Sequence, residues 1–462
     1  MQYNPHPYQT RAIDFITEHP NCAYWAEMGL GKSVVTLTAL DRLMYQLVDV
    51  EKALVIAPKS VAQNTWSGEA AKWDHLSHLR MSIVLGPEKK RLQALDKDAD
   101  IYVTNRENVT WLVEHYGKRW PFDCVVLDEA SSFKNFQSKR WKALWKVRPY
   151  MKRIIELTGT PAPNGLMDLW AQVKLLDRGD RLGRFIGQYR EAYFHPGARS
   201  GAVVYDWLAN KGAKERITEK ISDICLSMQA SDYLEMPMII DGGMTLTLDA
   251  MKNYRQFEKT CIMGLEDGAD IMAVTAVALT NKLLQFSSGA VYDDEHTWHE
   301  VSSTKIEALN DLLEQTDEPV LLFYNYQHEK ERIMQEHPEA VPFKGEPEIL
   351  TQWNEGEIKL LLCHPASVAY GLNMQQGGHI IVWYSPTWNL ELYQQANARL
   401  HRQGQTKPVI LYHLVCRDTM DEVVMDALRS KGNTQELLMR HLKELKHNKK
   451  CREKCNGSSD WP

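Results

Sequence analysis

Residues 26–33 combine glycines, a lysine and a serine in a pattern suited to binding phosphate. The string AEMGLGKS follows an expected strand and opens an apolar run of helical length, VVTLTAL. Gly29 and Gly31 would let successive backbone N–H groups face phosphate oxygens at the positive end of that helix. Lys32 would reach the β and γ phosphates, and the Ser33 hydroxyl would ligate Mg²⁺. Because the first position of the string is alanine where the strict pattern has glycine, a structural glycine turn is the alternative.

Two adjacent carboxylates, Asp128 and Glu129, end the apolar run CVVL. Ligands of parallel sheets bind at the carboxyl ends of the strands, so both side chains would face a nucleotide held by the glycine loop. There Asp128 can hold Mg²⁺, while Glu129 orients and deprotonates the attacking water. The alternative is an exposed Asp-Glu turn, and the phosphate loop about 100 residues earlier favours the metal site.

A pair of arginines, Arg399 and Arg402, lies within the string QANARLHRQGQ. They are three residues apart, so on a helix they would share one face. Guanidinium groups delivered to a nucleotide held by the other half of the chain would neutralise the charge that develops as the γ-phosphoryl group leaves. Catalysis would then require closure of a cleft between the two halves. A surface helix with two solvated arginines is the alternative.

Apolar runs of strand length, separated by helical lengths, must position these groups. Such runs are typical of a parallel sheet buried on both faces, and their return in the second half predicts two α/β lobes of one type. The runs are CAYWA near 22, ALVIA at 53, MSIVL at 81, IYVT at 101, CVVL at 124, RIIEL at 153, PVLLFY at 319, LLLCH at 360, HIIVWY at 379 and VILYHLV at 409. We expect lobes at 1–236 and 237–440, helical insertions at about 165–236 and 245–300, and a flexible basic tail at 441–462.

The bulk composition fits a soluble enzyme of the cytoplasm. Hydrophobic residues make up 44% of the chain and charged residues 25%, with no run of about 20 apolar residues and no secretory signal at the start. Eight scattered cysteines indicate reduced thiols. Since the net charge is -6, binding of nucleic acid would need a local basic surface.

Two weaker signals concern the tail and the tryptophans. His447, Cys451 and Cys455 are spaced four apart and could supply three zinc ligands, but no fourth ligand follows, so a disordered basic end is favoured. The chain has 14 tryptophans, including Trp66, which could stack on bases. Tryptophans more often fill cores, so none of them is assigned a role.

In combination, these motifs resemble the superfamily 2 helicases, and within them the Swi/Snf-type DNA translocases that include chromatin remodellers and bacterial and phage relatives. The resemblance covers nearly the whole chain, and the string HRQGQ at 401–405 is its most specific part. The matching strings are PYQ at 7–9, GLGKS at 29–33, IAPKSVAQNTW at 56–66, DEAS at 128–131, LTGTPAPN at 157–164, LLFYNYQHEKERI at 321–333, ASVAYGLNMQ at 366–375 and QANARLHRQGQ at 395–405.

The resemblance implies two tandem RecA-like lobes, an ATP site in the cleft between them, ATP and Mg²⁺ as cofactors, and movement along double-stranded DNA. The catalytic residues it implies are Lys32, Asp128, Glu129, Arg399 and Arg402. ATP would contact Gln9, which reads the adenine, and Met28, Gly29, Leu30, Gly31, Lys32, Ser33, Gly371 and Asn373. Mg²⁺ would be held by Ser33 and Asp128, and nucleic acid by Pro58, Lys59, Ser60, Thr158, Gly159, Thr160, Asn325 and Gln327.

Some positions depart from the family pattern. Ala26 stands where the family usually has aspartate, Ser131 replaces a common histidine, and Asn397-Ala398 replaces a pair that is often acidic. None of these changes removes a residue assigned to Mg²⁺, water or the γ-phosphate. We expect a monomeric motor that grips the phosphate backbone without sequence preference and that an unknown protein partner recruits. The alternatives are a strand-separating DNA or RNA helicase and a nucleotide-controlled switch that binds DNA or a partner without travelling.

Overall fold

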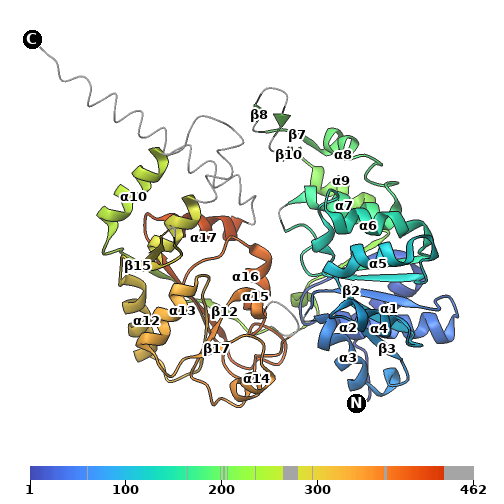
Figure 1. Cartoon of the computed structure of the whole chain (residues 1–462), viewed down its shortest axis with the longest axis horizontal. Coiled ribbons are helices and arrows are strands. Elements are labelled where there is room, and N and C mark those ends of the chain that lie inside the picture. The colour runs from blue at the N-terminus through green and yellow to red at the C-terminus, as the bar shows by residue number, and fades with distance from the viewer. Residues whose placement is uncertain are drawn as a thin grey trace, which may run out of the picture. The chain divides into compact units, whose positions relative to one another are not determined.

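The computed structural model describes residues 1–59, 61–163, 165–197, 199–200, 203–204, 207–234, 236–263, 279–293, 295–368 and 372–430. The chain divides into two compact units, residues 1–235 and 236–462 (Figure 1). Among the described residues, no helix combines the length and the apolar character that a membrane crossing requires.

The first unit is built on a seven-stranded sheet in which all neighbouring strands are parallel. All six apolar runs expected between residues 22 and 153 form strands of this sheet. A seventh strand, β11, was not predicted, because its sequence CLSM is short and its apolar residues are interrupted. In order across the sheet the strands are β11 (Cys225–Met228), β1 (Asn21–Ala26), β6 (Arg153–Thr158), β5 (Cys124–Asp128), β2 (Ala53–Ala57), β4 (Ile101–Asn105) and β3 (Met81–Val84).

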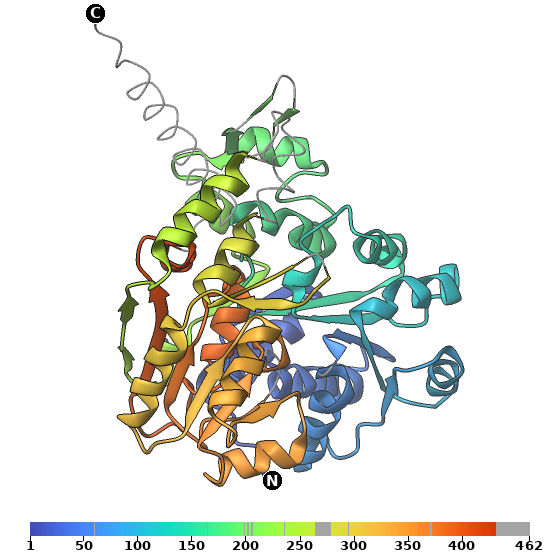
Figure 2. The ribbon, with the colours of Figure 1, turned by 60° about the vertical axis from the view of Figure 1, so that its left-hand side comes forward.

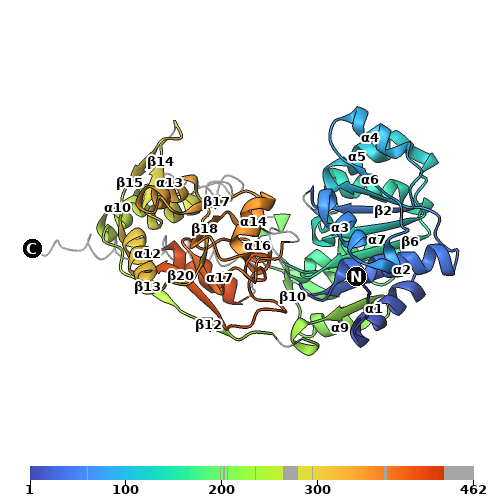
Figure 3. The ribbon, with the colours of Figure 1, turned by 90° about the horizontal axis from the view of Figure 1, so that it is seen from below.

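Helices cover both faces of this sheet, which explains why its strands are apolar throughout. Alternate residues of β2 are buried on opposite faces: Leu54 and Ile56 pack with α5, α6 and α7, while Val55 is buried on the other side. Figure 3 shows α1 and α2 on the opposite side of the sheet from α5 and α6. The helices are α1 (Pro7–Glu18), α2 (Lys32–Asp41), α3 (Trp66–Lys72), α4 (Glu88–Leu95), α5 (Val109–Tyr116), α6 (Lys139–Val147), α7 (Leu169–Asp177), α8 (Ile186–Tyr193) and α9 (Ala213–Ile221).

Short antiparallel strands interrupt the helical segment that was expected after residue 165. They are β7 (Phe194–Pro196) with β10 (Trp207–Ala209), and β8 (Arg199–Ser200) with β9 (Val203–Val204).

The second unit repeats the parallel design. Its sheet contains the four strands that were expected, and it adds three short ones. In order across the sheet the strands are β12 (Ile239–Asp241), β20 (Val409–Cys416), β19 (Ile380–Trp383), β16 (Val320–Phe323), β18 (Leu360–Cys363) and β17 (Val341–Phe343), and β13 (Met244–Leu246) also pairs with β20. Strands β12 and β13 follow one another along the edge of the red strand β20 (Figure 2). The expected architecture, two RecA-like α/β units with parallel sheets, is confirmed.

Both faces of the second sheet are also covered. Val320 and Leu322 of β16 pack with α12, while Leu321 and Phe323 pack on the other face with Trp353 of α14. The helices are α10 (Met251–Met263), α12 (Thr304–Glu314), α13 (Gln327–Glu336), α14 (Pro347–Asn354), α15 (Pro365–Val368), α16 (Leu390–Asn397) and α17 (Met420–Ser430). The antiparallel hairpin of β14 (Ala290–Tyr292) and β15 (Trp298–Glu300) lies near α10 in Figures 1 and 3.

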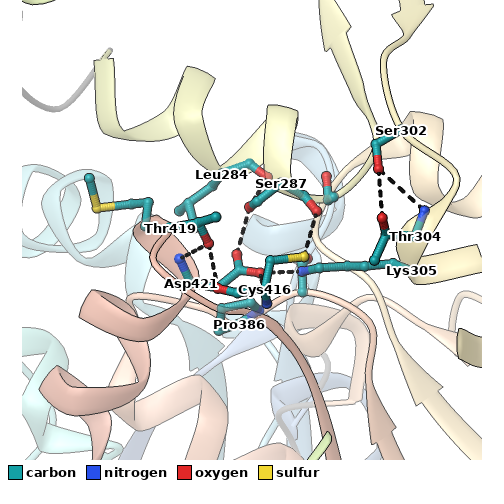
Figure 4. A network of polar contacts seen from close by, with 12 residues as sticks. Leu284, Ser287, Ser302, Thr304, Lys305, Pro386, Cys416, Thr419 and Asp421 are labelled. Carbon is teal, nitrogen blue, oxygen red and sulfur yellow. Dashed lines mark hydrogen bonds and ion pairs between the residues drawn. The ribbon is translucent and has the colours of Figure 1, made fainter. Parts of the chain in front are cut away.

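A buried ion pair joins the first helix after this hairpin to the last helix described. Lys305 of α12 lies 2.7 Å from Asp421 of α17, and both side chains are almost fully buried (Figure 4). The Asp421 carboxylate also accepts hydrogen bonds from the Ser287 hydroxyl at 2.7 Å and from the Cys416 backbone N–H at 3.0 Å. Because Lys305, Ser287 and Cys416 contact Asp421 from three different segments, they hold the start of α17 against the body of the unit.

Candidate functional site

The glycine loop of the first unit has the backbone that phosphate binding requires. Gly29 and Gly31 have φ angles of +91° and +75°, a region that favours glycine, and α2 begins directly afterwards at Lys32. The Lys32 ammonium donates a hydrogen bond of 2.6 Å to the carbonyl of Ala26, at the end of β1. The loop therefore places a cation and a helix N-terminus side by side, as predicted.

Gln9 of α1 lies directly against this loop. A Cβ atom on Gly31 would approach the Gln9 side-chain nitrogen to 2.7 Å, which is closer than real Cβ contacts. The Gln9 side-chain oxygen accepts a hydrogen bond of 3.0 Å from the His6 backbone N–H, which fixes the orientation of the amide. The residue expected to read the base and the loop expected to hold the phosphates are thus packed together.

The two carboxylates lie at the carboxyl end of β5. Burial, followed by the neighbouring Glu129, raises the pKa of Asp128 to about 6, whereas a hydrogen bond from Trp66 and the charge of Lys32 act in the opposite direction. The Trp66 indole N–H donates to the Asp128 carboxylate at 2.9 Å. A divalent cation beside this carboxyl would favour its charged form.

Glu129 is held in a left-handed backbone conformation, with φ at +60°. Such a conformation costs free energy for a residue other than glycine and is common at active sites. Its carboxylate accepts a hydrogen bond of 2.7 Å from the Thr158 hydroxyl, at the end of the adjacent strand β6. The Thr158 hydroxyl in turn accepts one of 3.1 Å from the Thr160 backbone N–H. The expected water-orienting residue is therefore joined to the LTGTP segment.

Gly159 places that segment against the phosphate loop. A Cβ atom built on Gly159 would lie 3.5 Å from the Ala26 carbonyl oxygen and 3.8 Å from the Lys32 ammonium. The structure thus brings Lys32, Asp128, Glu129 and the end of β6 together at the carboxyl ends of the strands of the first sheet.

A Mg²⁺ ion fits this edge only with help from a ligand. Among the described residues, no group of three or more His, Cys, Asp or Glu side chains could hold a metal ion. Asp128 would supply one carboxylate and Ser33, in the first turn of α2, would supply one hydroxyl. Mg²⁺ typically takes one or two carboxylates and completes its shell with phosphate oxygens and water, so this sparse set suits a metal that arrives with a nucleotide.

The residues expected to bind nucleic acid in the first unit differ in accessibility. Pro58 is buried and Lys59 is exposed, while Ser60 lies outside the described residues. Thr158 is fully buried, and its hydroxyl is engaged with Glu129, so its side chain is not offered to a ligand. Gly159 and Thr160 are partly accessible.

The two arginines of the second unit meet at one backbone oxygen. Arg399 and Arg402 both donate from Nη1 to the Leu372 carbonyl, at 3.0 Å and 3.2 Å. The expectation that they share a helical face is wrong, because α16 ends at Asn397 and both arginines lie in the turns that follow. Their convergence comes from these turns. Burial lowers the pKa of Arg402.

The other residues expected to bind ligands in the second unit make hydrogen bonds within that unit. The Asn325 amide donates to the Ser385 carbonyl at 2.9 Å, and the Gln327 amide donates to Glu331 at 3.1 Å. The backbone oxygen of Asn373, next to Leu372, accepts from Asn354 at 2.9 Å. Gly371 lies outside the described residues, as do His447, Cys451 and Cys455 of the candidate zinc site.

The sequence did not predict Trp66 as a partner of Asp128, the expected metal ligand. Trp66 was grouped with tryptophans that could stack on bases, but it is fully buried and its indole N–H is directed at Asp128. These residues are 62 positions apart, so only the folded sheet brings them together. A tryptophan close after a strand of the same sheet was the available signal.

Comparison with known proteins gives matches along most of the chain. Residues 8–184 match the SNF2-related domain, and residues 304–404 match the helicase conserved C-terminal domain. The chain is 37% identical to a putative protein p41 of Acyrthosiphon pisum secondary endosymbiont phage 1, over 96% of this chain and 99% of that protein. It is 24% identical to an uncharacterized ATP-dependent helicase of Mycoplasma genitalium, covering 90% of this chain and 40% of the helicase. It is also 24% identical to the DNA repair and recombination protein RAD54 of Oryza sativa, covering 90% of this chain and 49% of that protein.

Proposed function

Because this chain belongs to the SNF2-related family of helicase-like ATP hydrolases, we propose that it uses ATP and Mg²⁺ to move along double-stranded DNA. The observation that carries the proposal is the edge of the first sheet, where Lys32, Asp128 and Glu129 come together with the LTGTP segment. A triphosphate seated on the glycine loop would have a cation, a metal ligand and a water-orienting carboxylate around its γ-phosphate.

In this mechanism each residue of the site has a separate role. Lys32 would neutralise the phosphates, Asp128 and Ser33 would hold the metal, and Glu129 would orient the attacking water. When bound, Mg²⁺ would draw charge from the phosphate oxygens. Arg399 and Arg402 would exchange the Leu372 carbonyl for the γ-phosphoryl group, since a bond from a guanidinium to an anion is stronger than one to a neutral carbonyl.

Double-stranded DNA is the polymer we propose. Support comes from the family match, from a relative named for DNA repair and recombination, and from the HRQGQ string of the second unit. The hydrogen bond between Glu129 and Thr158 gives a physical route from the nucleotide to the segment expected to lie on the DNA track. Movement would follow if closing on ATP displaces that segment.

The test is ATP hydrolysis measured in parallel with no polymer, duplex DNA, single-stranded DNA and RNA. We expect duplex DNA to stimulate turnover most, with a steep dependence on salt. The same protein should displace a triplex-forming strand from duplex DNA in the presence of ATP without separating the duplex strands. Glu129→Gln should bind ATP and DNA together but turn over slowly.

Three outcomes would count against the proposal. Equal turnover with and without DNA would favour the nucleotide-controlled switch. Strand separation in a forked-duplex assay would favour a true helicase. Preferential stimulation by RNA would mean that the polymer is RNA and not duplex DNA.

A further inference from the structure

The segment that joins the two units is attached to functional residues at both of its ends. This connecting segment comprises residues 228–234 and 236–238, and it leads from the end of β11 to the start of β12. Its first part is bonded to the phosphate loop within the first unit. Its last part is bonded to the arginine motif within the second unit.

Glu27 makes the first attachment. Its backbone N–H donates to the Met228 carbonyl at 3.1 Å, and its carboxylate accepts from the Ala230 backbone N–H at 2.9 Å. The Glu27 carbonyl also lies 3.4 Å from the Lys32 ammonium. One residue of the glycine loop therefore contacts both the cation expected to bind phosphate and the beginning of the connecting segment.

Further contacts place the same segment against the nucleotide-binding edge. The centroid of the Tyr233 ring lies 5.0 Å from that of Tyr8, the residue before Gln9. The Leu234 side chain would lie 3.9 Å from a Cβ atom on Gly29. A turn stabilised by a 2.8 Å bond from the Leu234 N–H to the Ala230 carbonyl holds this arrangement.

His401 makes the second attachment. It lies between the two arginines in the sequence, and its Nε2 atom is 3.0 Å from the Pro237 carbonyl, so Nε2 carries the proton and donates. One residue later, the Met238 carbonyl accepts from the Val409 N–H at 2.8 Å. The end of the segment is thus fixed to the turn that carries Arg399 and Arg402.

We propose that Glu27 and His401 are positioning residues that couple the phosphate loop to the arginine motif through the connecting segment. The seven Cα steps from Ala230 to Pro237 can span at most about 25 Å, so the segment is a short tether. A triphosphate that draws Lys32 away from the Glu27 carbonyl changes the Glu27 peptide, and the Ala230 hydrogen bond passes this change to the segment. The inference rests on the proposed function, because it assigns the coupling device of that same ATP site.

The first test follows hydrogen exchange of the whole chain with and without a non-hydrolysable ATP analogue and Mg²⁺, in the absence of DNA. In the parent protein the analogue should change exchange both in the peptide covering the phosphate loop and in the one covering residues 228–238. In Glu27→Ala the loop peptide should still respond, whereas the response of the connecting segment should be lost. Glu27→Gln keeps an acceptor oxygen and should restore it. A segment response in Glu27→Ala that equals the parent's would overturn the proposal.

The second test measures duplex-DNA-stimulated turnover of Glu27→Ala, His401→Ala and the double variant. Each single variant should lower stimulated kcat about tenfold, within the usual range of coupling between linked sites, with an unchanged KM for ATP. Because either change breaks the same tether, the double variant should be no worse than the poorer single variant. Multiplied losses in the double variant would overturn the coupling.

Matched controls remove the same kinds of bond elsewhere. Asp123 accepts two backbone N–H bonds of 3.0 Å at the opposite end of the first sheet, and His337 contacts Asn310 at 2.8 Å in the second unit. Asp123→Ala and His337→Ala should leave stimulated turnover within about twofold of the parent, as expected for sites without shared partners. The parent could show no stimulation by DNA while its exchange response still depends on Glu27. That result would reject the proposed DNA motor but would support the coupling through the connecting segment.

Discussion

In the first unit the two carboxylates of the site are held by other side chains of the site, whereas in the second unit both arginines donate to backbone carbonyls. Asp128 accepts from Trp66, and Glu129 accepts from Thr158. Arg399 and Arg402 share the Leu372 oxygen. The carboxylates are thus fixed by mutual contacts that a nucleotide would leave in place. The arginines make bonds that an anionic phosphate can replace, because charge-assisted bonds are stronger.

The difference indicates how the two units share the chemistry. On the proposed function, the first unit would bind the nucleotide by itself, since the glycine loop, Lys32 and Asp128 all lie at the carboxyl end of its sheet. The arginines would, on the same function, stabilise the transition state only after giving up the Leu372 carbonyl. Binding should therefore depend on the first unit, and turnover on both.

The largest effect is expected for Lys32→Ala. Loss of this ammonium removes the cation beside the phosphate loop, so ATP binding should weaken and turnover should fall about a thousandfold or more. Lys142→Ala, an exposed lysine of α6, is the control. Binding of a fluorescent ATP analogue and steady-state hydrolysis measure the two quantities. Retained turnover would mean that the first unit does not hold the phosphates as the comparison requires.

Arg402→Ala should separate binding from turnover. We expect kcat to fall about a hundredfold to a thousandfold, because the charge on the γ-phosphoryl group loses a cation, while nucleotide affinity stays within about threefold. Arg417→Ala, an exposed arginine of the same unit, should have no effect. Normal hydrolysis by Arg402→Ala would show that the arginines are structural and that the difference between the units is incidental.

Trp66→Phe tests whether the mutual contacts of the first unit matter. The change keeps an aromatic ring but removes the N–H that donates to Asp128, so the Mg²⁺ concentration for half-maximal turnover should rise about tenfold to a hundredfold. Trp141→Phe loses an equivalent indole bond of 2.9 Å, to the Ala171 carbonyl, and serves as the control. An unchanged Mg²⁺ requirement would reduce Trp66 to a packing residue.

The smallest effect concerns stability and a second contrast between the units. Asp421 of the second unit is paired with Lys305, whereas Glu156 of β6 is fully buried without a hydrogen-bond partner for either carboxylate oxygen. Burial raises the pKa of Glu156 well above 4.5. Because this carboxyl ionises at lower pH in the unfolded chain than in the folded one, the free energy of unfolding falls as the pH rises from 4.5 toward the folded pKa.

Glu156→Gln should remove that loss. We expect a melting temperature about 2–4 °C higher than the parent's at pH 8 and little difference near pH 4.5. Thermal unfolding at several pH values measures this, with exposed Glu51→Gln as the control. A variant that is less stable than its parent at pH 8 would mean that Glu156 has a partner when folded.

The sequence predicted those parts of the molecule that depend on local patterns. The apolar runs of β1 to β6 and the glycine loop are readable because burial on both faces and the turn at Gly31 each impose a residue type on neighbouring positions. The apolar run of β11 is interrupted, and β17 has only three residues, so neither strand leaves a clear pattern. The contacts of Trp66 with Asp128 and of His401 with Pro237 span 62 and 164 positions, and only the folded chain creates them.

The turn after α16 illustrates a different limit. Spacing alone suggested one helical face for the two arginines, but the helix stops at Asn397. Their common target was set by the position of the Leu372 carbonyl, which no local rule specifies.

The close approach of Gly31 to Gln9 has a consequence for how nucleotides are discriminated. A single added methyl group at position 31 would lie 2.7 Å from the Gln9 amide nitrogen and would strain the backbone, because φ there is +75°. On the proposed function, this change would disturb the expected base-reading amide and the phosphate loop together. Contact with the base and contact with the phosphates would, on that function, both depend on the absence of a side chain at position 31.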